Sequence, residues 1–172
     1  MKTLAVLIAL LAALALQTTL SGLFGGRTIA VNLVVVVVVY IALAFGPVTG
    51  LLAGAAAGLA QDALAGGIVG IGGLSKTLVG FLVGVLGAQF IVSQTLPRFV
   101  MFVAATLVHQ LVFEALQALI GGRGFAPDYA AAMVQAVVNG VIGVTAFILV
   151  ERGPDMVQRR RMRRASLSKR RY

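Results

Sequence analysis

Four ionisable side chains interrupt the long apolar runs of this sequence: Asp62, Lys76, His109 and Glu114. A charge inside such a stretch is costly, so each of these residues is a candidate for function. Asp62 and Lys76 flank one connection between two apolar runs. They are placed to pair across it, although each can instead reach the water at a membrane surface. We interpret His109, the single histidine, as a hydrogen-bonded packing residue rather than a ligand.

These residues do not form a catalytic constellation. No helix carries paired carboxylates, and no histidine–carboxylate–serine set can be assembled from the spacing. The chain has no cysteine, which excludes disulfides, thiolate nucleophiles and thiolate metal sites. The run from Gly70 to Thr77 has the wrong spacing for a phosphate-binding loop, and no soluble strand precedes it. We therefore predict that the protein is not an enzyme and carries no metal or cofactor.

A polar seam is the second candidate site. Five polar residues recur at helical spacing on the last two apolar runs, where neighbours of this kind share a face: Gln110, Glu114, Gln117, Gln135 and Asn139. Counted from the connection at 121–128, Glu114 lies level with Gln135. By the same count, Gln110 lies level with Asn139. Groups placed in this way either join two helices by hydrogen bonds or line a small outward-facing cavity or partner site.

Composition indicates which elements must position these residues. Of the 172 residues, 60% are hydrophobic and only 11% are charged, and the mean hydropathy is +1.03. A soluble domain carries about 25% charged residues, so we predict an all-α integral membrane protein. Its apolar runs predict six transmembrane helices, at 3–20, 28–45, 47–64, 74–93, 98–120 and 129–150, and all four prolines fall at proposed boundaries. We divide the chain into a six-helix domain at 1–150 and a tail at 151–172.

Charge predicts the orientation of these helices. Six spans put both chain ends on one side of the membrane. With both ends cytoplasmic, eleven basic residues lie inside, and Arg27, Lys76 and Arg123 lie outside, which the positive-inside rule favours. The first run, behind Lys2, also fits a secretory signal peptide with a cleavage site at Ala13-Leu14-Ala15. Because further apolar runs follow at once, we interpret it as the first transmembrane helix.

Glycine recurs at every fourth position around the third run, with one aspartate in the series: Gly46, Gly50, Gly54, Gly58, Asp62, Gly66 and Gly70. In a helix this spacing makes a groove without side chains that drifts slowly around one side. Helices in lipid associate through such close packing. We expect the rest of the chain to pack around this stretch. We also expect Gly54 and Gly58 to seat another helix, Asp62 to fix it through Lys76 or backbone donors, and the drift to turn the two ends of the groove toward different neighbours.

Basic residues crowd the tail, which holds nine of the fourteen in the chain. Five arginines form its centre: Arg159, Arg160, Arg161, Arg163 and Arg164. On the cytoplasmic side we expect such a tail to bind anionic lipid, at about 1 kcal/mol per basic residue near the surface. An acidic protein partner is the alternative. We predict no nucleic-acid binding, because a short tethered tail has no fold for readout.

The stretch Gly54-Ala-Ala-Ala-Gly58-Leu59-Ala-Gln-Asp62, continued by Gly66, Gly70 and Leu74, resembles the MreD family of rod-shape-determining proteins. The match is to the pattern G-x-x-x-G-L-x-x-D followed by glycines and an apolar run. The chain length, the six-span layout, the short first hairpin and the charged tail are also similar to that family. The long arginine-rich tail goes beyond the family pattern.

The resemblance implies a non-enzymatic scaffold of the bacterial inner membrane that serves in cell-wall elongation. It implies MreC, a single-span periplasmic coiled-coil protein, as the direct partner, with MreB, RodA and the transpeptidase of RodA in the wider complex. It also implies a fold similar to the substrate-binding subunits of energy-coupling-factor vitamin transporters. A vitamin-binding transporter subunit is the alternative function. That alternative predicts an outward pocket with several aromatic residues, and the three tyrosines and absent tryptophan of this chain weigh against it.

Overall fold

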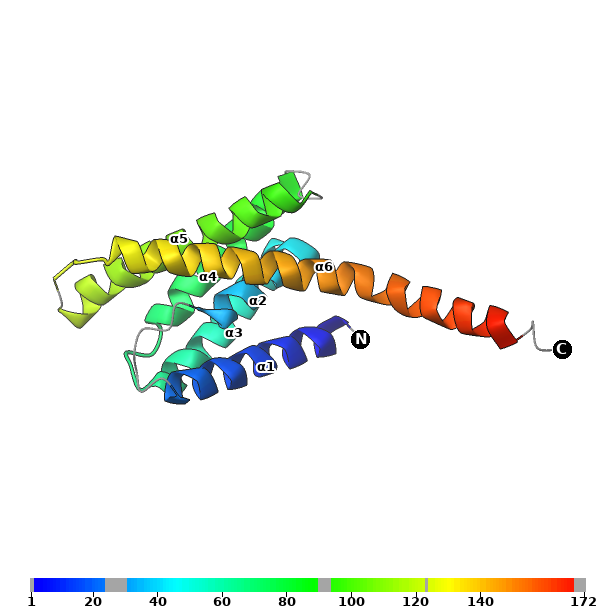
Figure 1. The fold of residues 1–172 in the computed structure, drawn as a ribbon. Helices are drawn as coiled ribbons and strands as arrows, with labels where there is room; N and C mark the ends of the chain where they lie inside the picture. Colours follow the sequence, from blue (N-terminus) through cyan, green and yellow to red (C-terminus); the bar gives the residue numbers. More distant parts are fainter. Residues whose placement is uncertain (1, 24–30, 90–93, 123, 169–172) are drawn as a thin grey trace.

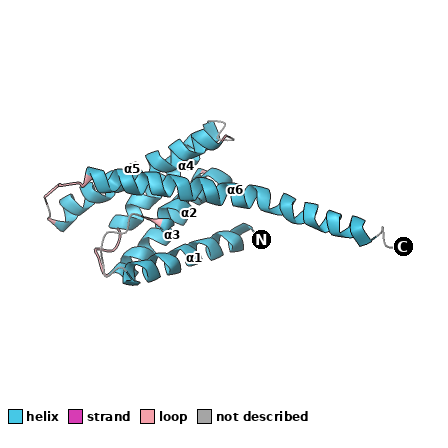
Figure 2. Ribbon diagram, in the orientation of Figure 1, coloured by secondary structure: helices cyan, strands magenta, loops and turns pink. Residues whose placement is uncertain are grey.

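The computed structural model describes residues 2–23, 31–89, 94–122 and 124–168, and for residues 2, 3, 5 and 152–168 it describes the helix without the side chains. Six helices follow one another (Figure 1): α1 (Lys2–Leu23), α2 (Leu33–Phe45), α3 (Pro47–Ala65), α4 (Ile71–Gln89), α5 (Thr95–Gly121) and α6 (Tyr129–Ser168). Within these ranges there is no strand, and only loops and turns join the helices (Figure 2). The prediction of an all-α protein is confirmed.

The helix at the centre of the bundle is α2, which contacts each of the other five (Figure 1). One face of α2 packs on α1 and α3, and another packs on α4, α5 and α6. A helix covered on all sides needs no polar face, which explains its unbroken run of valines from Val34 to Val39. The expectation that the chain packs around the glycine-rich stretch is therefore wrong. The glycine-rich α3 contacts only α1, α2 and α4 within the described chain.

Four helices are long and apolar enough to cross a membrane: Pro47–Ala65, Ile71–Gln89, Thr95–Gly121 and Tyr129–Glu151. In the described part of the chain, Val6–Gly22 of α1 and the whole of α2 are shorter apolar helices. The expected span at 28–45 is thus helical only from Leu33, and residues 28–30 lie outside the described ranges. The 13 residues of α2 cover about 20 Å, less than a hydrocarbon core of about 30 Å. Other helices, rather than lipid, cover most of its surface.

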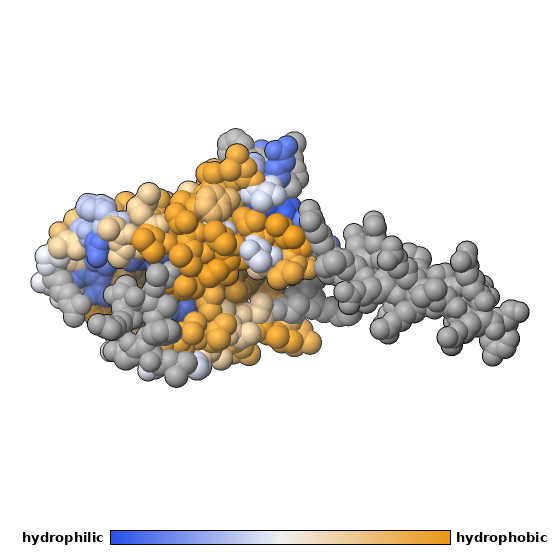
Figure 3. Space-filling model, viewed as in Figure 1, coloured by the Kyte–Doolittle hydropathy of each residue, from blue (hydrophilic) through white to orange (hydrophobic). Residues whose placement is uncertain are grey.

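The outer surface suits a lipid environment. Figure 3 shows a broad apolar band across one face, with hydrophilic residues gathered toward its two ends. Large leucine, isoleucine, valine and phenylalanine side chains are exposed on the helices of this band. An apolar surface of this extent does not occur on a soluble monomer. With the four long apolar helices, it identifies a membrane protein.

Pro97 and Pro154 do not lie at the helix boundaries that the sequence predicted. Pro47 opens α3 as expected, but Pro97 lies in the first turn of α5, which begins at Thr95. Proline is tolerated there because the first amides of a helix have no acceptor within it. Pro154 does not end α6, which continues to Ser168 and extends beyond the bundle (Figure 1). The helix thus continues beyond the predicted span at 129–150, which itself agrees with the apolar part of α6, Tyr129–Glu151. Pro154 removes one backbone bond, and the arginine-rich run that follows has good helix propensity.

Candidate functional site

Asp62 fastens the end of α3 to the beginning of α4. Its side chain is buried, with 8% exposed. Its Oδ2 accepts hydrogen bonds from the backbone amides of Gly70, at 2.8 Å, and Gly73, at 3.1 Å. The first amides of a helix lack partners within it, and its N-terminus carries partial positive charge. Across the loop at 66–70, the carboxylate accepts two of these backbone amides and offsets the positive charge of the helix N-terminus. This explains why α4 begins at Ile71 rather than at the predicted residue 74.

Lys76 lies beside this carboxylate and is only 2% exposed. A Cβ built on Gly72 would come within 3.0 Å of Asp62 Oδ1 and to 3.2 Å from Lys76 Nζ. The two polar atoms therefore share the space next to Gly72, which has no side chain to displace them. The sequence allowed two anchors for Asp62. The structure places backbone amides on Oδ2 and the ammonium group near Oδ1.

A second buried polar cluster joins α2 to α5 and α6. The Asn139 side chain on α6 is fully buried. Its Oδ1 accepts the backbone amide of Asn32 at 3.0 Å, and its Nδ2 donates to Thr106 Oγ1 at 3.3 Å. Asn32 in turn places its Nδ2 3.4 Å from His109 Nε2 and accepts the Val35 amide with its Oδ1 at 3.2 Å. His109 is thus part of a packed polar network, as we interpreted it.

Gln17 extends this cluster to α1. Its Nε2 donates to the carbonyl of Val31 at 3.2 Å, and its Oε1 accepts the amide of Leu33 at 2.9 Å. These backbone groups stand just before and at the start of α2, where no helical partner serves them. Sequence reasoning overlooked both Gln17 and Asn32. The available signals were a lone amide in an apolar run, and an asparagine at the N-cap position before the valines.

The glycines in the middle of the four-residue series pack against α4. A Cβ built on any of them would come within 3.0 Å of the α4 backbone: Gly50 meets Gly80, Gly54 meets Lys76 and Gly58 meets Gly72. Each step of four along α3 matches a step of four back along α4, as in an antiparallel pair. Helices can pack along such rows, so α4 lies along the whole groove from Gly50 to Gly58. The expectation of different neighbours at its two ends is corrected, since only Gly50 also touches α2, at Ala42.

The remaining glycines of the series shape turns. Gly46, Gly66 and Gly70 have φ angles of 89°, 67° and 112°, a region that favours glycine. Gly46 separates α2 from α3, and Gly66 ends α3 in the left-handed conformation. Gly70 precedes α4 and donates its amide to Asp62. The series thus combines a packing face with three backbone turns.

The predicted polar seam is divided between two places. Gln135 and Asn139 are buried, whereas Gln110, Glu114 and Gln117 are partly exposed. Asn139 bonds Thr106, one helical turn farther from the connecting loop than the expected neighbour, Gln110. The loop causes this shift. Its residues Gly124 and Ala126 line a cavity together with the last turns of α5, so the loop runs back along α5 before α6 begins.

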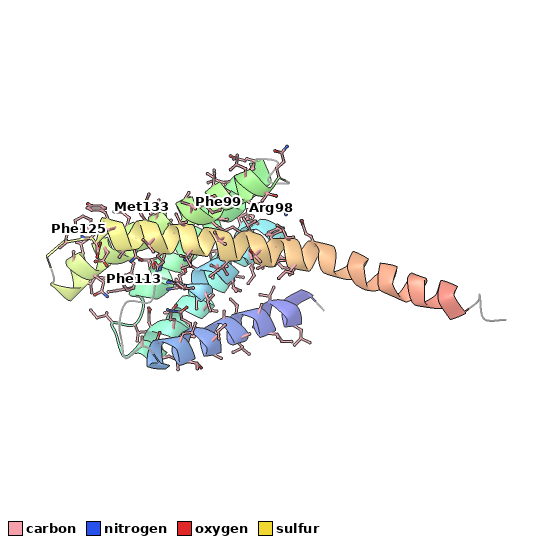
Figure 4. The ribbon with its side chains drawn as sticks, viewed as in Figure 1. Arg98, Phe99, Phe113, Phe125 and Met133 are labelled. Carbon is pink, nitrogen blue, oxygen red and sulfur yellow. The ribbon has the colours of Figure 1, made fainter. Side chains whose placement is uncertain are left out.

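We call this cavity the outer hollow. It has a volume of about 330 Å³ and is lined by Phe113, Glu114, Gln117, Ala118, Gly124 and Ala126. Figure 4 shows Phe113, with Phe125 of the loop, at the end of the molecule opposite Arg98. The Phe113 ring also packs on the His109 ring, with centroids 5.9 Å apart. The outer hollow therefore adjoins the buried polar network and brings Glu114 and Gln117 together.

At the opposite end, an ion pair holds α5 to α6. Arg98 NH1 and NH2 donate to the two carboxylate oxygens of Glu151, each at 2.7 Å. The guanidinium carbon lies 4.1 Å from the centroid of the Phe147 ring, which packs on Tyr40. The pair holds α6 where it leaves the bundle. The tail arginines follow this point, and their side chains lie outside the described part of the structure.

The buried polar groups of the described residues do not form a metal centre. No group of three histidine or acidic side chains there is placed to hold a metal ion. Most of the buried polar groups described above bond to backbone atoms or to one another. Their chemistry is that of joining helices.

The family model of the rod shape-determining protein MreD matches residues 1–152. No curated protein and no solved structure matches the chain. The likeness to energy-coupling-factor transporter subunits therefore stays a prediction. The match ends beside Glu151, so the arginine-rich part of α6 lies beyond it.

Proposed function

The chain belongs to the MreD family of rod shape-determining proteins, and on that premise we propose that it is a non-enzymatic scaffold of the bacterial cell-wall elongation machinery. In this role it binds MreC directly and helps to organise the peptidoglycan synthases. MreB, RodA and the transpeptidase of RodA belong to the same assembly. The family match carries this proposal.

The interior of the bundle supports a scaffold better than a transporter subunit. The buried polar side chains of the interior hydrogen-bond to other helices or to backbone groups at helix ends, as at Asp62, Gln17, Asn32 and Asn139. A vitamin site would place several aromatic residues around an outward pocket. Among the described residues that line the outer hollow, Phe113 is the one aromatic residue, and the volume of about 330 Å³ is at the low end for small-molecule sites.

We place the protein in the cytoplasmic membrane as a multi-pass protein with both ends in the cytoplasm. The start of α1 and the far end of α6 lie at the same end of the bundle (Figure 1), which suits this orientation. Arg98 lies toward that end, opposite the loop before α6 (Figure 4). Reporter fusions after Tyr172 and within 121–128 should then report opposite sides. An external signal from the fusion after Tyr172 would contradict the orientation.

Affinity purification from native membranes in mild detergent tests the scaffold role. The tagged chain should retain MreC, identified by protein mass spectrometry. Gly58→Leu, which removes the space between α3 and α4, should reduce both the folded chain and the retained MreC. Recovery of folded chain without MreC, or with the energising subunits of a transporter, would contradict the proposal.

A further inference from the structure

Acidic residues are scarce in this basic chain, and the structure accounts for nearly all of those it describes. The side chains of four of the five are described, Asp155 being the fifth. Three have partners: Asp62 accepts the amides at the start of α4, Asp128 accepts the Ala131 amide at 3.0 Å, and Glu151 pairs with Arg98. Within the described residues Glu114 has neither a hydrogen bond nor an ion pair.

The position of Glu114 makes this unusual. It is partly buried, toward one end of a helix apolar enough to cross a membrane. A charge in such a place is costly without a partner. Glu114 lines the outer hollow together with Gln117 and Phe113. A carboxylate, an amide oxygen and an aromatic face are together the groups that bind a guanidinium or an ammonium ion.

We propose that the outer hollow receives the guanidinium or ammonium group of a basic side chain from a membrane-protein partner. Glu114 is the counter-ion, Gln117 offers a second acceptor, and Phe113 forms the aromatic wall. The inference rests on the proposed scaffold function, because the basic side chain comes from the partner that this function requires.

Charge and size favour this occupant over others. A free metal ion needs several oxygen ligands, and the described residues hold no acidic or histidine group of three. A vitamin-sized ligand is less favoured, because a volume of about 330 Å³ is at the low end for small-molecule sites. A long basic side chain needs only one carboxylate and a narrow hollow. The loop residues Gly124 and Ala126 on its wall are exposed, so the hollow lies beside a surface that a partner can reach.

The test measures the affinity of the full-length chain for purified MreC in mild detergent. Glu114→Gln should raise the dissociation constant tenfold or more, since hydrogen bonds to charged groups contribute about 1.5–3 kcal/mol. The unfolding temperature should not change, because the amide is almost isosteric. Gln110→Ala, one turn away and outside the wall of the hollow, is the matched control and should bind as the wild type does. Arginine added at 100 mM should compete more strongly than NaCl of the same ionic strength, roughly in proportion to occupancy of the hollow.

Each other outcome decides against the inference. If the wild-type pair forms and Glu114→Gln binds equally well, the hollow does not receive the partner, and the scaffold function stands. If Arg123→Gln, in a position outside the described residues, causes the same loss, the cation belongs to this chain. Loss of self-association in Glu114→Gln, with MreC binding intact, would assign the cation to a second copy. Failure of the wild-type pair to form would remove the scaffold function and this inference together.

Discussion

Gly22→Ala and Gly58→Ala are the same chemical change in two helices, and the structure predicts opposite effects on stability. Gly22 lies in the last turn of α1, and a Cβ added to it meets no atom of the described residues within 4 Å. Alanine is favoured over glycine inside a helix by about 1 kcal/mol. Gly22→Ala should therefore raise the free energy of unfolding by up to about that amount.

At Gly58 the added Cβ would lie 2.6 Å from Gly73 Cα and 2.8 Å from Gly73 N, where ordinary contacts are 3.4–4 Å. These are backbone atoms that no rotamer change can move away, so α3 and α4 must separate. Overpacking of this kind costs about 1–3 kcal/mol. Separation also weakens the bond from the Gly73 amide to Asp62, which contributes about 1 kcal/mol. After the gain in helix preference of about 1 kcal/mol, the protein should lose about 1–3 kcal/mol.

Equilibrium unfolding of both variants in mixed detergent micelles measures the difference. The two should differ by about 1–4 kcal/mol, with Gly58→Ala the less stable. Gly58→Leu should be worse and should lower the yield of folded chain. Equal stabilisation by both alanine substitutions would show that the glycine face of α3 does not pack tightly on α4.

Three further predictions follow from the polar contacts. Asn139→Ala should lower the unfolding free energy by about 1–3 kcal/mol, because the Asn32 amide loses its buried acceptor; an unchanged unfolding midpoint would argue against the network. A double-mutant cycle of Arg98→Ala and Glu151→Ala should give a coupling of about 1 kcal/mol, held down by the 49% exposure of Glu151; no coupling would show that the pair does not hold α6. Replacing the five central tail arginines by Gln should weaken binding of a tail peptide to anionic vesicles by several kcal/mol; equal binding of the native peptide to neutral vesicles would exclude the lipid role.

The helix pattern could be predicted because local chemistry sets most helix ends. α3 was expected at 47–64 and spans Pro47–Ala65, since proline opens it and a glycine ends it. Where such signals were weak, the predicted helix ends differ from the observed ones. The valine run before Phe45 gives no periodicity, so the start of α2 at Leu33 is marked by the Asn32 cap and by the bond from the Leu33 amide to Gln17. Pro154 looked like a helix end by its residue type, and the helix continues through it.

The contacts of the site were harder to predict than its members. Periodicity shows which residues share a face of one helix, but it does not show which helix lies opposite. Asn139 was expected beside Gln110 by counting from the loop, and the backward run of the loop puts Thr106 there instead. Asn32 belongs to the network through helices distant in sequence, and Gln17 bonds to backbone groups at the start of the next helix. Asp62 was predictable, because its backbone partners lie only a short loop away.

Native mass spectrometry of the assembly, released from mild detergent, tests most directly whether the chain acts by binding membrane proteins. The scaffold function predicts a complex whose mass equals the chain plus MreC, without a vitamin-sized adduct. The complex should weaken in Gly58→Leu and persist in Gly22→Ala. A chain that leaves the detergent alone with a stoichiometric small molecule bound would contradict the scaffold function and favour the transporter alternative.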